Sequence, residues 1–72
     1  MKPDEIEVGA YYKIKTIPGN TIVYYVAERL VNGYDKWFRA TVYDNEHHWL
    51  GQKLLRAHEF AKMIDRRVKP RS

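Results

Sequence analysis

Three histidines have the widest chemical repertoire in this sequence, because imidazole can ligate a metal ion or carry a proton. His47 and His48 are adjacent, so on an extended strand they point to opposite faces and cannot share one ion. A zinc site needs three or four converging ligands. Glu46, Glu59 and His58 are the remaining candidates, but their spacing matches no known ligand pattern. We therefore expect no metal and no other cofactor, with the histidines as polar residues near turns.

Catalytic motifs are not visible in the chain. It has no cysteine, which excludes a disulfide, a thiolate metal site and a cysteine nucleophile. No elbow-type motif surrounds any serine or threonine, and the carboxylate pairs lie at expected turns or termini, where local backbone hydrogen bonds explain them. The four glycines are isolated, so no loop can cradle a phosphate. A chain of 72 residues also leaves little room for a water-excluding pocket. We predict that the protein is not an enzyme.

Aromatic and cationic side chains alternate with small apolar ones in KWFRATVYDNEHHWLG, residues 36–51. On a strand, alternate side chains point to opposite faces. One face would carry Trp37, Arg39, Thr41 and Tyr43. The other would carry Phe38, Ala40 and Val42, with Leu50 from the next strand, and we expect this second face to be buried.

The first face combines the groups that bind single-stranded nucleic acid, since aromatic rings stack on bases and Lys or Arg binds the backbone. A preceding strand adds outward Tyr11, Lys13 and Lys15, and the strand after it offers either Tyr24 or Tyr25. The predicted nucleic-acid-binding residues are Tyr11, Lys13, Lys15, Trp37, Arg39, Tyr43, Trp49, Arg56, Lys62, Arg66, Arg67 and Lys69. Trp, Tyr and Arg are also favoured at protein interfaces, so a protein-binding surface is the alternative.

Four strands are needed to position these side chains. Alternation and β-rich composition predict strands over residues 10–17, 21–30, 36–44 and 46–50, after a loose lead-in at residues 1–7. Pro18-Gly19-Asn20 and Asn32-Gly33 are tight-turn sequences, and Asp44-Asn45 marks a third turn. Tight turns favour an antiparallel meander, which we place at residues 8–51.

The apolar period changes after Gly51. Residues 54, 57, 61, 64 and 68 are apolar and spaced alternately by three and four, which indicates an amphipathic helix over residues 53–68. A shorter helix at about residues 58–64, followed by a last edge strand at about 66–69, also fits. Residues 69–72 would form a basic tail. The helix could cap an open end of the sheet or lie across it, where it would cover Trp37, Tyr43 and Trp49.

The segments EVGAYYKIK and WFRATV, separated by a turn, a long strand and a hairpin, resemble the SH3-like small barrels. Tudor, chromo-barrel and KOW-type modules belong to that group. The resemblance covers roughly residues 7–50 and implies a partly open barrel. We therefore predict a mainly β, α+β domain: a small antiparallel, partly open SH3-like barrel of four to five strands with a C-terminal helix. All 72 residues form one domain in this prediction.

The net charge of +4 is unevenly distributed. Residues 1–52 hold six Lys or Arg and seven Asp or Glu, giving −1, whereas residues 53–72 hold seven and two, giving +5. Such asymmetry indicates contact with nucleic acid or an acidic surface. A solvated helix face followed by a basic tail is the alternative explanation.

We predict a small nucleic-acid-binding module, with single-stranded nucleic acid favoured as its partner. The alternative is a protein-interaction module, such as an adaptor, a subunit or a phage- or mobile-element-type factor that binds a host protein. No stretch resembles a signal peptide or the roughly 20 apolar residues of a membrane span, so we expect a soluble, cytoplasmic protein without a membrane partner. It would be a monomer or an edge-strand homodimer, because a partly open barrel leaves backbone groups unpaired.

Overall fold

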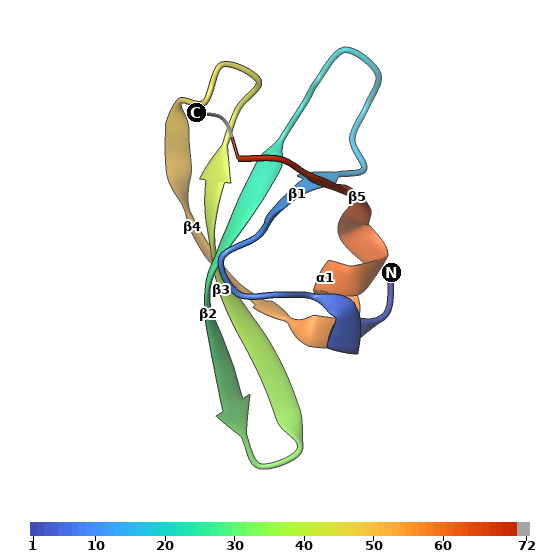
Figure 1. The fold of residues 1–72 in the computed structure, drawn as a ribbon, viewed down its shortest axis with the longest axis vertical. Helices are drawn as coiled ribbons and strands as arrows, with labels where there is room; N and C mark the ends of the chain where they lie inside the picture. The colour runs from blue at the N-terminus through green and yellow to red at the C-terminus, as the bar shows by residue number, and fades with distance from the viewer. Residues whose placement is uncertain (71–72) are drawn as a thin grey trace.

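A five-stranded antiparallel sheet dominates the computed structural model, which describes residues 1–70 (Figure 1). The strands are β1 (Tyr11–Ile14), β2 (Val23–Asn32), β3 (Asp35–Tyr43), β4 (Trp49–Arg56) and β5 (Ile64–Val68). A helix, α1 (Ala57–Met63), connects β4 to β5, and a 3-10 turn, η1 (Pro3–Glu5), precedes β1. The order β4-β3-β2-β1-β5 leaves β4 and β5 at the two edges, so within residues 1–70 the sheet is not closed. The predicted fold class, a mainly β antiparallel domain with a C-terminal helix, is confirmed.

The β2–β3 hairpin is the longest pairing in the sheet. Its register runs from Val23 opposite Tyr43 to Asn32 opposite Asp35, and the turn is closed by Gly33 at a φ of 63°. This left-handed conformation is the one for which Asn-Gly hairpin turns are selected. The distal half of the hairpin projects beyond the rest of the sheet (Figure 1), in a molecule that measures 37 × 20 × 18 Å.

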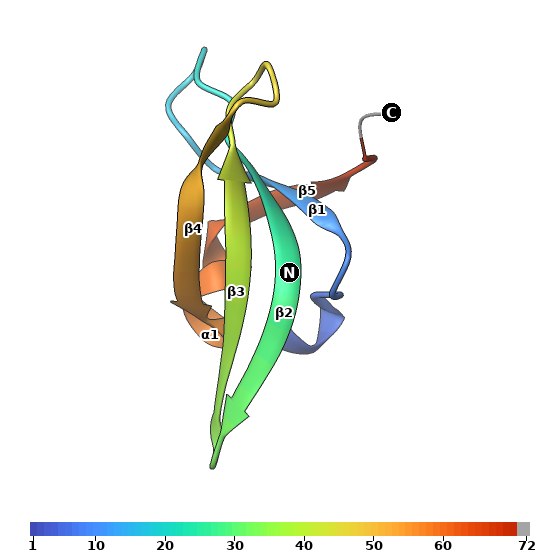
Figure 2. The same cartoon turned by 90° about the vertical axis from the view of Figure 1, so that its left-hand side faces the viewer.

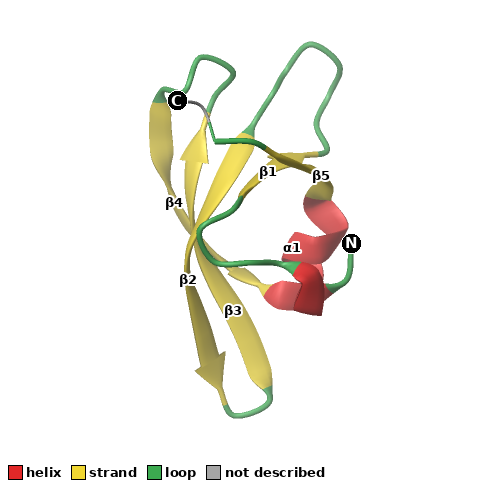
Figure 3. Cartoon of the chain, viewed as in Figure 1, coloured by secondary structure: helices red, strands yellow, loops and turns green. Residues whose placement is uncertain are grey.

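The core lies between one face of the sheet and the two helical segments, which Figure 3 shows on the same side of it. Phe60 of α1 is fully buried at its centre. Its ring centroid is 6.2 Å from that of Tyr12, 5.7 Å from Tyr24 and 6.0 Å from Phe38. Burying a side chain of this size stabilises the fold by about 1.5–3 kcal/mol. We call this covered side the inner face.

The C-terminal third folds as a short helix and a last strand. The prediction of one helix over residues 53–68 is wrong, and the alternative with a final edge strand describes the chain, with somewhat different bounds. Ala57, Phe60 and Ala61 form the buried stripe of α1, at the spacing expected for one helix face. Leu54 instead lies in β4, with 56% of its surface exposed. Ile64 is the first residue of β5 and pairs with Ile14 of the neighbouring strand β1.

Strand β4 starts and ends later than the predicted strand at residues 46–50. Trp49 pairs with Tyr43 and Gly51 with Val42, so Leu50 is the extra residue of a β-bulge. The predicted burial of Leu50 is therefore wrong: 53% of it is exposed, where it lines a shallow groove beside β2 and β3. The predicted burial of Phe38, Ala40 and Val42 is confirmed.

Both ends of β1 are also different from the prediction. The strand is short, ending at Ile14, although the backbone N–H of Lys15 still donates to the carbonyl of Met63 just before β5. The N-terminal segment is not a loose lead-in, since Ile6 is buried and the N–H of Glu7 donates to the hydroxyl of Tyr12 at 3.0 Å. At the other end, Lys69 and Pro70 follow β5, and the rest of the predicted basic tail, residues 71–72, lies outside the described residues.

Helix length is relevant to membrane contact. Across residues 1–70, no helix combines the length and the apolar character that a membrane crossing requires.

Candidate nucleic-acid interface

The side of the sheet opposite α1, which we call the outer face, brings predicted site residues together. Directly opposed residues of antiparallel strands point to the same face, so the register groups side chains into rows across the sheet. The first row is Arg66, Lys13, Val23, Tyr43 and Trp49, from β5 to β4. The second row is Val68, Tyr11, Tyr25, Thr41 and Gln52. Two shorter rows follow on β2, β3 and β4: Glu28, Arg39 and Leu54, then Leu30, Trp37 and Arg56.

Helix α1 leaves the outer face uncovered. Figure 2 shows β2, β3 and β4 from this side with α1 behind them. The alternative in which the helix covers Trp37, Tyr43 and Trp49 is wrong, because Phe60 binds α1 to the inner face. Trp49 is 66% exposed, and Trp37 and Tyr43 are half-buried.

Aromatic rings cluster near the β3–β4 turn. The rings of Tyr11 and Tyr25, opposed across β1 and β2, lie 4.8 Å apart between centroids. The ring of His47 lies 5.5 Å from Tyr43 and 6.3 Å from Tyr11, so it bridges the two tyrosines. All four rings are half-buried, so part of each ring stays accessible to solvent. Such a cluster suits stacking of unpaired bases.

A shallow groove of about 390 Å³ adjoins this cluster. Its lining includes three cationic side chains, Lys13, Arg66 and Lys69. It also includes His47, which belongs to the ring cluster. Lys13 Nζ lies 3.7 Å from a carboxylate oxygen of Asp65, and both side chains are partly exposed. Exposed pairs of this kind contribute at most about 1 kcal/mol, so the ammonium can exchange its partner for a phosphate.

The two shorter rows of the outer face hold two further cations, and each contacts a neighbouring side chain. The guanidinium of Arg56 stands 4.9 Å from the ring centre of Trp37, a cation–π contact. An Arg39 nitrogen lies 2.8 Å from a carboxylate oxygen of Glu28. The local charge around Arg39 is therefore balanced in the free protein.

Eight of the twelve predicted residues thus share the outer face: Tyr11, Lys13, Trp37, Arg39, Tyr43, Trp49, Arg56 and Arg66. Lys69 lies beside it in the groove. Three others do not join them. Lys15 is in the β1–β2 connection, Lys62 is on α1, and Arg67, opposite Tyr12, forms a 3.1 Å ion pair with Glu7.

Two rings of the cluster were not in the predicted site. The sequence does not distinguish Tyr24 from Tyr25 as the outward ring, because every residue from 22 to 27 is apolar or aromatic and no alternation is visible. The predicted strand at residues 46–50 includes His47, but His47 occupies the turn before β4, at a φ of 65°. Only its position two residues before Trp49 suggested the outer face.

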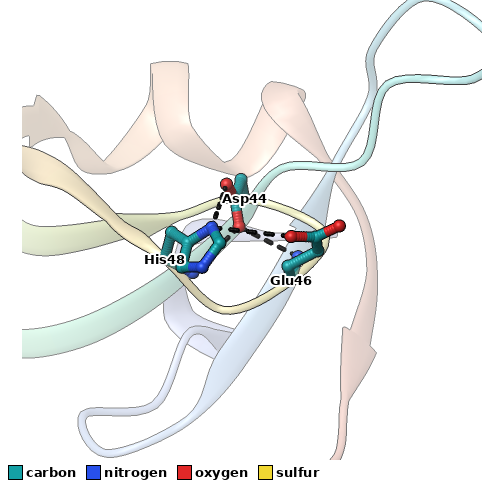
Figure 4. A network of polar contacts seen from close by, with 3 residues as sticks. All are labelled: Asp44, Glu46 and His48. Carbon is teal, nitrogen blue, oxygen red and sulfur yellow. Dashed lines mark hydrogen bonds and ion pairs between the residues drawn. The ribbon is translucent and has the colours of Figure 1, made fainter.

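Asp44 holds the β3–β4 turn in this shape (Figure 4). Its Oδ1 accepts the backbone N–H groups of His48 at 2.8 Å and Glu46 at 2.9 Å. Its Oδ2 lies 3.2 Å from Nδ1 of His48. The His48 N–H is the main cause that lowers the pKa of the Asp44 carboxyl from its ordinary 3.8, and the Glu46 N–H acts in the same direction. Among residues 1–70, no cluster of three His, Asp or Glu side chains has a geometry suited to a metal ion.

Comparison of the chain with protein-family models, curated proteins and solved structures gives no match. Inference about function therefore depends on the geometry of the outer face.

Proposed function

We propose that the protein is a small nucleic-acid-binding module that holds single-stranded DNA or RNA on its outer face. The supporting observation is the first row of that face, which passes from the cations Arg66 and Lys13 to the aromatic rings of Tyr43 and Trp49. Phosphates would contact Lys13, Arg66 and Lys69. Bases would stack on the exposed ring surfaces, at about 1–3 kcal/mol per stacked base.

The width of the sheet and the charges of the hairpin favour single strands over a duplex. Five strands with neighbours about 4.8 Å apart give a sheet roughly 19 Å across, wide enough for a few splayed nucleotides. Reading a duplex in its major groove usually requires a projecting helix or ribbon. Helix α1 is not available, because its buried stripe packs against the inner face. The projecting half of the β2–β3 hairpin is a ribbon, but its charges are balanced: Glu28 and Asp35 against Arg29 and Lys36.

Adjacent arginines on opposite faces of β5 provide the test. Arg66→Ala should weaken binding of a labelled oligonucleotide about two- to fivefold at 50 mM salt, since one exposed ionic contact is lost. Arg67→Ala, whose side chain pairs with Glu7, is the matched control and should change binding little. Equal effects of the two variants would show that net charge, not the outer face, governs binding.

Stacking is tested in the same assay. Trp49→Ala should weaken binding about fivefold or more, the lower end of the range for one stacked base. Tyr34→Ala removes a fully exposed ring at the tip of the β2–β3 hairpin and should have no effect. Absence of any binding at 50 mM salt by the unaltered protein would overturn the proposal.

Tyr34 supports the second candidate function, a protein-interaction module of the adaptor, subunit or phage-factor type. Its side chain and 61% of Val31 are exposed near the end of a projecting hairpin, and Tyr is favoured at interface hot spots. A partner captured from nuclease-treated lysate and lost on Tyr34→Ala would favour this function. The likeness to SH3-like barrels and a cytoplasmic location stay predictions, and neither candidate depends on them.

A further inference from the structure

The two edges of the sheet differ in how they are protected against pairing with another strand. Strand β5 carries three adjacent charged residues, Asp65, Arg66 and Arg67, and Pro70 follows it. Charges and proline are the usual means of blocking an edge. Strand β4 instead exposes three large apolar side chains: Trp49 at 66%, Leu50 at 53% and Leu54 at 56%. Within residues 1–70, β4 pairs with β3 alone, and it forms the side of the sheet seen at the left of Figure 2.

The charges along β4 are opposite at its two ends. The turn before the strand carries Asp44 and Glu46, and Glu46 is 76% exposed. The end of the strand carries Lys53 and Arg56, both exposed. A second β4 in antiparallel orientation would place the acidic end of each strand beside the basic end of the other. A parallel pairing would instead oppose like charges.

The apolar side chains fit the same arrangement. Trp49 and Leu54 share the outer face and lie on either side of Gly51 and Gln52. An antiparallel pair centred on that dipeptide brings Trp49 of each copy beside Leu54 of the other. It also keeps the two Lys53 side chains apart along the strands, by roughly 10 Å at about 3.4 Å per residue.

We propose that two copies of this chain pair through antiparallel β4 strands and form a two-fold symmetric dimer. Each β4 then gains a neighbour on its free side, and the two sheets become one. Because the contact is isologous, it uses the same surface of both copies and closes at two. The consequence for ligand binding depends on the proposed function: the two outer faces join into one longer surface for a single strand.

The mass of the protein in solution, measured by sedimentation equilibrium without nucleic acid, tests the dimer. We expect twice the chain mass of 8.6 kDa at high protein concentration, with reversible dissociation on dilution. A mass of one chain throughout, as in a monomer whose β4 serves another partner, would overturn the proposal. So would a mass above two chains, because an isologous pair cannot extend.

Charge reversal locates the interface. Arg56→Glu and Glu46→Arg should each raise the dimer dissociation constant about tenfold, since each change acts twice in a two-fold contact. The double variant should restore the dimer, because the opposite charges again face each other. Arg29→Glu, at an exposed site on β2, is the matched control and should leave the mass unchanged. A dimer insensitive to both single reversals uses another surface and would overturn the proposal.

Leu54→Lys tests the apolar contact and should give the mass of one chain, whereas Ile17→Lys, at a 77% exposed loop residue, should leave the dimer intact. Circular dichroism of each variant verifies folding, and a misfolded variant is replaced by Leu54→Thr.

Oligonucleotide binding is measured separately, so that the dimer and the proposed function are tested independently. A monomer that binds would overturn the dimer alone, and a dimer that does not bind would overturn the proposed function alone.

Discussion

Asp44 is a single side chain that shapes the end of the candidate site. Its carboxylate accepts two backbone N–H groups and contacts the His48 ring, which folds residues 44–48 into a closed turn. That turn holds His47 in the left-handed region, where its ring reaches Tyr43 and Tyr11. Asp and Asn are favoured in such turns because the side chain replaces a backbone acceptor.

Removal of this carboxylate should give a stability loss that depends on pH. The folded state lowers the pKa of Asp44 below 3.8, so its stabilising contribution is complete above that value and disappears as the pH falls through the folded-state pKa. Asp44→Ala should therefore lower the urea midpoint at about pH 7, and the difference from the unaltered protein should shrink below about pH 3.8. Asp44→Asn keeps one acceptor oxygen and should lose less. A difference that is constant with pH would contradict this account.

Among the secondary-structure elements, the bulge in β4 decides which side chains that strand presents on the outer face. Leu50 and Gly51 together oppose Val42, which shifts the parity of the strand between Trp49 and Gln52. Without this shift, Trp49 could not share the outer face with Leu54 and Arg56. Gly51 permits it with a φ of 143°, a region that side-chain-bearing residues rarely adopt.

Gly51→Ala should consequently destabilise the fold by about 1–3 kcal/mol, the usual cost of a residue held in such a backbone region. Steric contact is not the cause, because an added Cβ would meet no atom within 4 Å. Urea denaturation followed by circular dichroism measures the loss. Gly33→Asn is the control: its φ of 63° is accessible to Asn, so the loss should stay below about 1 kcal/mol. Equal losses would show that the bulge conformation is not required.

The sequence predicts elements well where local signals agree with pairing. Asn32-Gly33 and the alternation of residues 36–43 indicate the β2–β3 hairpin, and the same parity places Trp37, Arg39 and Tyr43 on one face. Strand β4 was mispredicted because Leu54 continues the helical spacing of Ala57 and Ala61. Only pairing with Arg39, 15 residues earlier in the chain, makes Leu54 part of a strand.

The candidate site was predictable to the same extent. The alternation of side chains along the strands identifies its aromatic residues. The charged residues of the C-terminal segment show no such alternation, so the sequence does not indicate which of them share a face. The sequence therefore predicts Lys62 and Arg67 in the same site as Arg66, whereas Lys62 lies on α1 and Arg67 on the inner side of β5. The bulge and the turn position of His47 depend on tertiary register, which no local pattern reports.

At the scale of the whole molecule, folding redistributes the charge of the basic C-terminal segment. The sequence places +5 on residues 53–72, yet the cations of residues 53–70 separate among β4, α1, the two sides of β5 and the segment after it. Three cations gather at one groove, Lys13, Arg66 and Lys69, and the first of these comes from the other end of the chain. The field that a ligand meets is therefore set by topology more than by net charge.

The salt dependence of oligonucleotide binding should show whether the three cations of the groove matter more than net charge. Each phosphate contact contributes about 0.7 to the slope of log K against log salt for single strands, so replacing Lys13, Arg66 and Lys69 together with Ala should reduce the slope by about 2. The matched control replaces Lys15, Lys62 and Arg67 with Ala and removes the same charge away from the groove. If both triple variants lose the same slope, binding follows net charge and the groove has no special role.

The division of aromatic residues between the two faces has an optical consequence. Both tryptophans of the chain, Trp37 and Trp49, belong to the outer face, whereas the core rings around Phe60 are tyrosine and phenylalanine. Intrinsic indole emission consequently originates at the candidate binding surface and not in the interior. A ligand that stacks there should quench the emission, so the intrinsic fluorescence of the unlabelled protein reports ligand binding directly.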